Sequence, residues 1–259
     1  MEIISERKVQ NLKAAIFDFD GTLSSLRCGW EKIMLPLMTE YTSEEAENEC
    51  KKYIDDSAGI QTIHQMKWLC EKVKECNNPK NAPLDPWFFK EEYNKRLIKS
   101  VNEKKKTVDN NPVLAEKYII GGAVNFLKTL KHNGIMLFAA SGTDEQDVIK
   151  ESKTLGLFGY FESVNGALPH SESCSKEAVI TKLIKDLCIP PESILICGDG
   201  KVEIQLGIQN NCITLGIASD EEKLVGFNKQ KEQRLKKAGA DAITGDFTEL
   251  GLLTSWLSL

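Results

Sequence analysis

Two aspartates directly after an apolar segment are the residues of this chain best suited to chemistry. Residues 14–17 are apolar, and Asp18 and Asp20 follow, with Gly21 next in the chain. An apolar run of this kind predicts a buried parallel strand, and the glycine predicts the turn that ends it. Because two carboxylates at one strand end repel each other, they require a shared proton or a cation. A hard divalent cation with oxygen ligands, such as Mg²⁺, is the natural partner.

A hydroxyl group follows the next strongly apolar run. Residues 135–140 are predicted to form a strand, and Ser141-Gly142-Thr143 comes directly after it. Thr143 begins a capping-box pattern, which predicts a helix from there to about residue 155. A helix start favours an anion, so Ser141 and the Gly142 N–H are candidates for binding a phosphate oxygen. The alternative is a plain turn with a helix cap, and the pattern alone does not separate the two.

An acidic pair follows a third predicted strand, at residues 194–197. Asp199 stands between two glycines at the end of this strand, and Glu203 follows four residues later in a predicted helix. Residues four apart lie on one face of a helix, so the pair could share a metal with Asp18. The alternative is that acidic residues stabilise the first turn of the helix through its dipole.

A lysine at a predicted helix start completes this set. Lys176 opens a helix predicted over residues 176–187. A cation there opposes the helix dipole, so Lys176 requires a compensating partner, for which a phosphate is a candidate. The alternative is an ordinary surface lysine.

The sequence that positions these residues divides into a part with alternating helices and strands and a part with helices alone. From residue 119 onward, predicted helices and strands alternate, which predicts a parallel sheet with helices on both faces. Residues 24–118 show helical periodicity and almost no strand signal, with helices predicted at 42–57, 60–76 and 85–106. We therefore expect an α/β core domain of residues 1–23 and 119–259 and an inserted all-α domain of residues 24–118. Ser219 to Glu222 is acidic enough for a metal, but we favour a capping box before a helix.

Composition narrows the class of protein. The chain has 259 residues, of which 41% are hydrophobic and 27% charged, with a net charge of −5 and no basic block. Nucleic acid is therefore an unexpected partner. Apolar runs are far shorter than the roughly 20 residues of a membrane span, and the first residues lack a signal-peptide pattern, so we expect a cytoplasmic protein. None of the eight cysteines forms a C-x-x-C pair, which favours buried free thiols over a zinc or redox site.

The pattern D-x-D-G-T-L at residues 18–23 resembles the first motif of the haloacid dehalogenase (HAD) superfamily. Ser141, Lys176, and Asp199 with Glu203 match the later motifs of that family in order, so the resemblance covers most of the chain. It is strongest to the phosphoglycolate phosphatase and β-phosphoglucomutase branch. The resemblance implies a Rossmann-like core with a C1-type helical cap. Many relatives carry Asp where this chain has Glu203, which leaves open whether Glu203 binds a metal directly or through water.

The resemblance also implies roles for individual residues. Asp18 would be the nucleophile and Asp20 the general acid/base, and the catalytic set would comprise Asp18, Asp20, Ser141 and Lys176. The cofactor would be Mg²⁺, bound by Asp18, Asp20 (through its carbonyl), Asp199 and Glu203. Substrate contacts are predicted for Gly142 and Thr143, for Arg27 toward a second anionic group, and for Gln61 and Thr62 of the insert toward a polar leaving group.

The function that these expectations favour is a Mg²⁺-dependent phosphatase. Its partner would be a small phosphorylated metabolite, such as a sugar phosphate or a phosphoglycolate-like acid, and we expect a monomer or homodimer. One alternative is a phosphomutase of the β-phosphoglucomutase kind. Another is a non-catalytic metabolite-binding protein on the same fold, although such a protein has no need of a nucleophile beside an acid. A dehalogenase is disfavoured because that branch lacks the second carboxylate, here Asp20.

Overall fold

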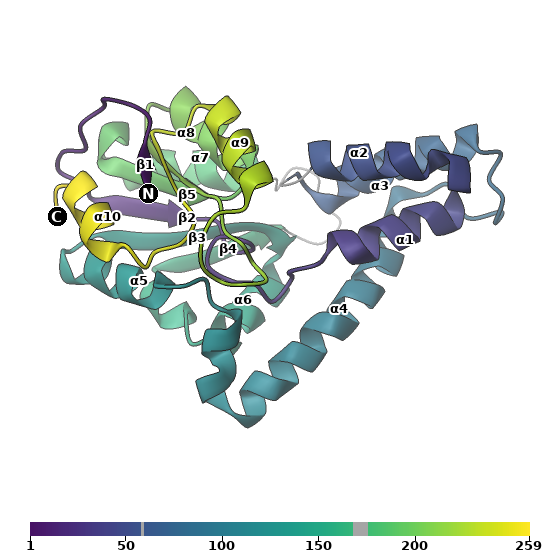
Figure 1. The fold of residues 1–259 in the computed structure, drawn as a ribbon, viewed down its shortest axis with the longest axis horizontal. Coiled ribbons are helices and arrows are strands. Elements are labelled where there is room, and N and C mark those ends of the chain that lie inside the picture. Colours follow the sequence, from purple (N-terminus) through teal and green to yellow (C-terminus); the bar gives the residue numbers. More distant parts are fainter. Residues whose placement is uncertain (58–59, 168–175) are drawn as a thin grey trace. The chain divides into compact units, whose positions relative to one another are not determined.

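The protein consists of two compact units. The computed structural model describes residues 1–57, 60–167 and 176–259. Unit 1 comprises residues 1–28 and 107–259, and unit 2 comprises residues 29–106 (Figure 1). Residues 24–28 and 107–118, which the sequence assigned to the helical insert, belong to unit 1.

Backbone pairing explains where unit 1 begins and ends around the insert. The Ile120 N–H donates to the Leu23 carbonyl at 3.0 Å, and the Ser25 N–H donates to the Tyr118 carbonyl at 2.9 Å. The outgoing and returning chain segments therefore run beside each other for several residues before unit 2 starts. Leu26 adds to this by packing, fully buried, in the main hydrophobic core.

Unit 1 is built on a seven-stranded sheet with the order β1-β7-β6-β5-β2-β3-β4. All neighbouring strands are parallel except β1, which pairs antiparallel with β7. The strands are β1 (Glu2–Ile3), β2 (Ala14–Phe17), β3 (Met136–Asp144), β4 (Ser163–Ala167), β5 (Ile194–Gly198), β6 (Ile213–Ile217) and β7 (Ala242–Thr244). The helices are α5 (Ala123–His132), α6 (Glu145–Thr154), α7 (Lys176–Leu187), α8 (Lys201–Gln209), α9 (Lys229–Ala238) and α10 (Leu250–Trp256).

Helices cover both faces of this sheet, as Figure 1 shows. Side chains alternate along β2, so Ala15 and Phe17 pack in one core and Ala14 and Ile16 in another. The first core includes residues of α5, α6 and α10, and the second includes residues of α7 and α8. This double burial explains why β2 is apolar at every position, as expected for a central strand of a parallel sheet.

The register of β2 aligns three strand ends. Phe17 pairs with Ala139 of β3 on one side and with Cys197 of β5 on the other. The residues that follow these positions, Asp18 and Asp199 among them, therefore emerge at the same edge of the sheet. This is the carboxyl edge, where open α/β sheets bind ligands.

Unit 2 contains helices and no strand among its described residues. Its helices are α1 (Glu31–Tyr41), α2 (Glu47–Asp56), α3 (Thr62–Glu75) and α4 (Pro86–Asn110), the last of which ends within unit 1. They surround a separate core that includes Met34, Leu69 and Phe89. Tyr53 and Trp68 stack with their ring centroids 4.0 Å apart, which joins α2 to α3. A short 3₁₀ turn at 44–46 precedes α2, so this helix begins later than the capping pattern at Thr42 predicts.

Two predicted capping boxes differ from the structure, although the helix predicted after Thr143 is present as α6. The strand β3 continues through Ser141 to Asp144, and α6 begins at Glu145, because the Thr143 hydroxyl bonds to another segment instead of capping the helix. The acidic segment at 219–222 forms a turn rather than a helix start, and α9 is capped instead by Asn228, whose side chain accepts from two backbone N–H groups. In both places the hydroxyl that the local pattern assigns to a cap has a partner far away in the sequence. Thr143 donates to Asp20, and Ser219 donates to the Gly21 carbonyl.

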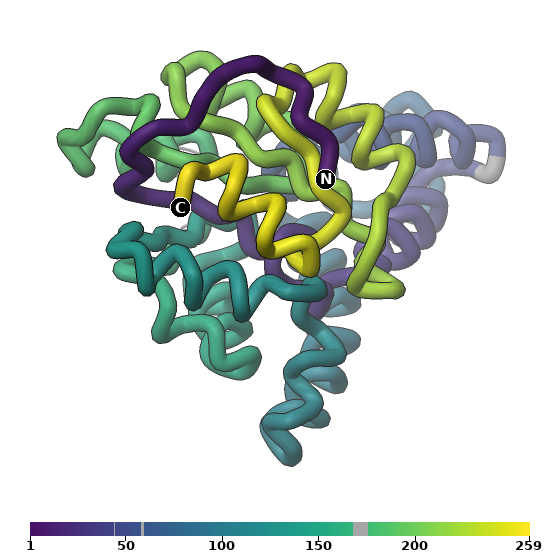
Figure 2. The backbone as a smooth tube through the Cα atoms, turned by 60° about the vertical axis from the view of Figure 1, so that its left-hand side comes forward, coloured from purple at the N-terminus to yellow at the C-terminus, as the bar shows by residue number. Residues whose placement is uncertain are grey.

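The amino-terminal segment runs beside the carboxyl-terminal helix (Figure 2). The Ser258 hydroxyl donates to the Val9 carbonyl at 3.0 Å, and the Met1 ammonium pairs with Glu249.

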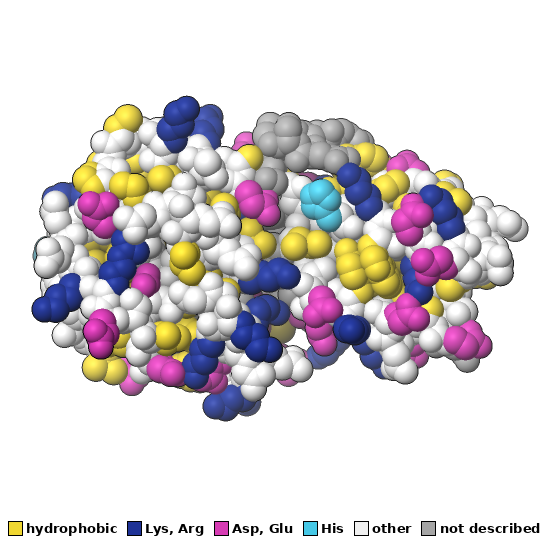
Figure 3. All heavy atoms as spheres, turned by 90° about the horizontal axis from the view of Figure 1, so that it is seen from above, with side chains coloured by type: hydrophobic (Ala, Val, Ile, Leu, Met, Phe, Trp, Pro, Cys, Tyr) yellow, Lys and Arg dark blue, Asp and Glu magenta, His cyan; other side chains and the backbone are white. Residues whose placement is uncertain are grey.

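On the face in Figure 3, acidic and basic side chains are interspersed. Among the helices of the described residues, none is both long enough and apolar enough to cross a membrane.

Candidate functional site

Asp18 and Lys176 form a buried ion pair at the carboxyl edge of the sheet. Asp18 follows β2 directly, and its Oδ1 lies 2.7 Å from Nζ of Lys176, the first residue of α7. The same ammonium donates to Oε1 of Glu203 in α8, and all three side chains are almost fully buried. These two carboxylates compensate the positive charge of Lys176 at the start of α7. Oε2 of Glu203 is buried, and no described residue forms a hydrogen bond to it.

The charges of this cluster are unequal. Burial opposes the charge on Lys176, but Asp18 and Glu203 raise the pKa of its ammonium above the ordinary value. Burial also raises the pKa of the Asp18 carboxyl well above its ordinary value, and the nearby Glu203 and Asp199 add to this rise, while Lys176 opposes it. One lysine therefore faces more carboxylates than it can neutralise. A further cation at this place would relieve the imbalance.

The carboxyl group of Asp20 is held from one side. Its Oδ2 accepts hydrogen bonds from the Thr143 hydroxyl at 2.8 Å and from the Ser141 hydroxyl at 3.2 Å. Its Oδ1 is buried without a hydrogen-bond partner among the residues that the structure describes. The Ser141 hydroxyl, which the sequence assigned to a phosphate, thus contacts the second aspartate, as does the Thr143 hydroxyl, which was predicted as a helix cap and a substrate contact. The Ser141 hydroxyl also accepts from the Thr143 N–H.

Arg27 lies against Asp20 and is held by an acidic residue of α6. Its Nη2 donates to Oε1 of Glu151 at 2.6 Å and its Nε donates to Oε2 at 3.2 Å, which makes a bidentate pair. Nε is also 3.8 Å from Oδ1 of Asp20, and Nη2 is 3.9 Å from Asp147. In this structure the guanidinium that was predicted to meet an anionic substrate group is surrounded by carboxylates of the protein.

Asp199 has a lysine partner that the sequence motifs do not include. Its Oδ2 lies 2.7 Å from Nζ of Lys231 in α9, and Lys231 also bonds to Glu221 at 2.6 Å and to the Ser219 hydroxyl at 3.1 Å. Burial opposes the charge on Asp199, but Lys231 lowers the pKa of its carboxyl below the ordinary value. The Ser219 hydroxyl donates in turn to the Gly21 carbonyl, which ties this group to the turn after Asp20.

The residues present suit a hard divalent cation in chemical type. Asp18 and Asp199 supply carboxylate oxygens, and the carboxylates of Glu203 and Asp199 add negative charge around Asp18. The turn at Gly21 is close-packed against Asp199, because a Cβ at Gly21 would overlap its carboxylate. Within residues 1–57, 60–167 and 176–259, no cluster of three or more His, Cys, Asp or Glu side chains is arranged to hold a metal ion. The four-residue metal set, Glu203 included, stays a prediction.

The remaining predicted contacts are distributed over both units. Gly142 lies in the extended end of β3, where an added Cβ would meet no atom within 4 Å. Gln61 is buried and directly precedes α3, and Thr62 is its first residue, so both belong to unit 2. Their role as substrate contacts stays a prediction.

Lys231 and Glu151 could not be found from the sequence by motif or spacing. Lys231 lies among other lysines in α9 and Glu151 in a mostly polar stretch of sequence, so neither stands out, and both acquire their partners only through the fold. The close approach of Gly21 to Asp199 could not be predicted from the sequence either. The glycine itself indicates only a turn, consistent with its φ of +74°.

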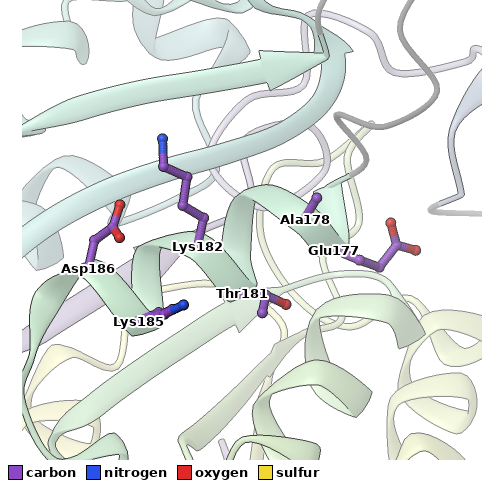
Figure 4. Close-up of a pocket in the computed structure, with 6 residues that line it drawn as sticks. All are labelled: Glu177, Ala178, Thr181, Lys182, Lys185 and Asp186. Atoms are coloured by element: carbon purple, nitrogen blue, oxygen red, sulfur yellow. The ribbon is translucent and has the colours of Figure 1, made fainter.

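A shallow hollow lies along α7, away from this cluster. It is lined by Glu177, Ala178, Thr181, Lys182, Lys185 and Asp186, all of one helix (Figure 4). None of these residues belongs to the carboxylate and lysine cluster described above. We therefore assign the candidate site to the strand ends and not to this hollow.

Comparison with protein families places most of the chain in one group. The family model described as haloacid dehalogenase-like hydrolase matches residues 15–217. This span begins in β2 and ends with β6, so it includes the strand ends that carry the site. A sequence search among curated proteins finds no match.

Solved structures share the fold along nearly the whole chain. A predicted phosphatase from Clostridium acetobutylicum is 18% identical, with a TM-score of 0.65 and coverage of 96% of this chain and 100% of the other. A predicted phosphoglycolate phosphatase from Haemophilus somnus 129PT is 17% identical, with a TM-score of 0.64 and coverage of 95% and 99%. A β-phosphoglucomutase from Clostridium difficile is 17% identical, with a TM-score of 0.66 and coverage of 95% and 97%. At these identities the similarity shows a common fold.

Proposed function

Because the chain belongs to the haloacid dehalogenase-like hydrolase family, we propose that it is a phosphatase acting on a small phosphorylated metabolite. The substrate class would be a sugar phosphate or a phosphoglycolate-like acid. The reaction would pass through a phosphorylated aspartate. The observation that supports this most directly is that two aspartates of one strand end have different partners, Asp18 a buried lysine and Asp20 two hydroxyls. Carboxylates kept in different environments are suited to different roles.

In the first step, Asp18 is the nucleophile. One of its oxygens attacks phosphorus in line with the ester oxygen, the new bond makes an aspartyl-phosphate, and the bond from phosphorus to the ester oxygen breaks. Lys176 fixes the orientation of Asp18 before the attack and remains close to the negative charge that the phosphate brings. Asp20 gives a proton to the departing oxygen.

In the second step, water removes the phosphate from Asp18. Asp20, which is now ionised, takes a proton from the water as its oxygen attacks phosphorus. The bond between phosphorus and Asp18 breaks, inorganic phosphate leaves, and both aspartates return to their starting states. Ser141 and Thr143 keep Asp20 in place through both steps by donating to Oδ2.

Asp18, Asp199 and the Asp20 carbonyl would hold Mg²⁺, with Glu203 near the Lys176 ammonium. When bound, the cation supplies positive charge that offsets the repulsion between a carboxylate nucleophile and a phosphate.

The test is phosphate release from a panel of phosphorylated metabolites, with Mg²⁺ or with EDTA, for the wild type beside Asp18→Asn. We expect release that requires Mg²⁺ and falls by about 10³-fold or more in the variant. A folded protein that binds Mg²⁺ and releases no phosphate from any substrate would refute the phosphatase. If labelled phosphate instead stays on the sugar at a new position, the protein is a phosphomutase.

A further inference from the structure

Arg27 and Glu151 form a buried ion pair that the proposed chemistry does not use. The Glu151 side chain is 1% exposed and the Arg27 side chain 12% exposed. Burial raises the pKa of the Glu151 carboxyl to about 7, against the opposing attraction of Arg27. A buried ion pair of this kind is weak evidence for a purely stabilising role, because the desolvation cost of two charges offsets much of their attraction.

The pair is located at the carboxyl group that would transfer protons. Oδ2 of Asp20 is occupied by the hydroxyls of Ser141 and Thr143, which leaves Oδ1 as the oxygen without a hydrogen-bond partner in the described parts of the chain. Nε of Arg27 lies 3.8 Å from this Oδ1, which is too far for a hydrogen bond. The guanidinium is therefore next to the one oxygen of Asp20 that remains open.

Glu151 determines what Arg27 can do at this distance. The Nε–H is donated to Oε2 of Glu151, and Nη2 is donated to Oε1. Because Glu151 takes these two N–H groups, Arg27 presents positive charge to Asp20 without closing a hydrogen bond to Oδ1. If Glu151 lost its charge, the guanidinium would be drawn to Asp20, and Oδ1 would become a hydrogen-bond acceptor for it.

We propose that Arg27 and Glu151 are positioning residues that keep Oδ1 of Asp20 open to carry the proton for the leaving group. This inference rests on the proposed phosphatase function. When the bond from phosphorus to the ester oxygen breaks, the proton passes from Oδ1 to that oxygen. A water proton returns to Oδ1 during hydrolysis of the aspartyl-phosphate.

The proposal is tested by the leaving-group dependence of kcat/KM, which reports the first step. Phenyl phosphate has a basic leaving group that needs a proton, whereas p-nitrophenyl phosphate has a stable anionic leaving group that needs little help. In Glu151→Gln we expect kcat/KM to fall about 10- to 100-fold for phenyl phosphate and less than about threefold for p-nitrophenyl phosphate, since general acid catalysis contributes roughly 10²–10⁴-fold. A loss of general stability or folding would lower both values in the same proportion.

Matched variants make the result specific. Asp147→Asn is the matched control. Asp147 lies one turn earlier on α6, 3.9 Å from Arg27, and its side chain is 33% exposed. We expect this variant to keep kcat/KM for both esters near the wild-type values. Glu151→Asp keeps the charge and is expected to restore part of the phenyl phosphate activity. If Glu151→Gln does not fold, Glu151→Met tests the same selective loss. The double variant Arg27→Met with Glu151→Met replaces the buried pair by apolar groups and should regain the leaving-group dependence of the wild type, because no guanidinium is left to bond to Oδ1.

The outcomes separate this proposal from the proposed function. Wild-type protein that hydrolyses neither these esters nor any metabolite of the panel in the presence of Mg²⁺ would overturn both. Active wild type together with equal losses for the two esters, or with no loss in Glu151→Gln, would overturn the positioning role and leave the phosphatase intact.

Discussion

The ammonium of Lys231 lies 2.7 Å from Oδ2 of Asp199, a residue expected to bind a metal. Lys231 comes from α9, and its side chain is 11% exposed. The Asp199 carboxylate is therefore already paired with a cation of the protein. If Asp199 binds a metal as predicted, the Lys231 ammonium competes with that metal for the carboxylate.

Replacing Lys231 by Met should strengthen Mg²⁺ binding. The substitution removes a positive charge from the immediate surroundings of Asp199, so the attraction for a divalent cation increases. We expect an affinity increase of roughly tenfold, which corresponds to about 1.4 kcal/mol. Isothermal titration calorimetry measures it without reference to catalysis. Lys229→Met, an exposed change on the same helix, serves as the control, and unchanged or weaker binding in Lys231→Met would contradict the competition.

Replacing Lys176 by Met should destabilise unit 1 strongly. Asp18 and Glu203 would both lose the cation that pairs with them in the buried site, and an uncompensated buried charge costs about 3–5 kcal/mol. Urea denaturation gives the free energy of unfolding. Adding Glu203→Gln to Lys176→Met should recover part of the loss, because one of the two orphaned charges is removed. Lys182→Met, at an exposed position of α7, should cost little, and equal costs for the two lysines would exclude the role of the buried cluster.

Replacing Gly21 by Ala should damage both stability and catalysis. Gly21 has a φ of +74°, and a Cβ there would overlap the Asp199 carboxylate. Gly156 is the matched control, because its φ is +69° and an added Cβ would meet nothing within 4 Å. Gly156→Ala should therefore cost only the backbone term, about 1–2 kcal/mol, and Gly21→Ala more than that. Similar unfolding free energies for the two variants would show that Asp199 gives way without cost.

The Cys212 thiol should be almost unreactive in the folded protein. Burial raises the pKa of this thiol to about 12, and Glu192 adds to this while Arg7 opposes it. The thiolate is the reactive form, so its fraction at pH 8 is roughly 1,000-fold below that of an ordinary thiol. Its alkylation rate should rise about tenfold per pH unit up to pH 10 without levelling off. Mass spectrometry of iodoacetamide-treated protein measures this, with the exposed Cys188 as the internal reference; comparable labelling of both at pH 8 would contradict the prediction.

The strand ends were the part of this protein most readable from its sequence. Strands β2, β5 and β6 match their apolar runs. Asp18, Asp20 and Lys176 lie at one edge of the sheet. These features depend on local patterns, since a buried parallel strand must be apolar and must end at a turn. The helical nature of residues 29–106 was readable for the same reason.

What the sequence could not give is the partner of each charged side chain. Thr143 has the spacing of a helix cap, yet its hydroxyl bonds to Asp20, which is more than a hundred residues earlier. Lys231 resembles the other lysines of a polar helix and is distinguished only by its contact with Asp199. The strand β1 is two residues long and exists because β7 offers it an edge. Such long-range contacts leave no trace in local spacing.

The interruption of unit 1 by unit 2 has a consequence for synthesis of the chain. The central strand β2 hydrogen-bonds only to β3 and β5 within the sheet, and both are translated after the whole of unit 2. At roughly 5–20 residues per second, β2 waits on the order of 10 s for its first neighbour. Unit 2, which has its own core, is complete within that interval. During this time both edges of the apolar strand β2 are unpaired, while unit 2 can already fold. Slower elongation therefore lengthens the period in which β2 is prone to aggregate.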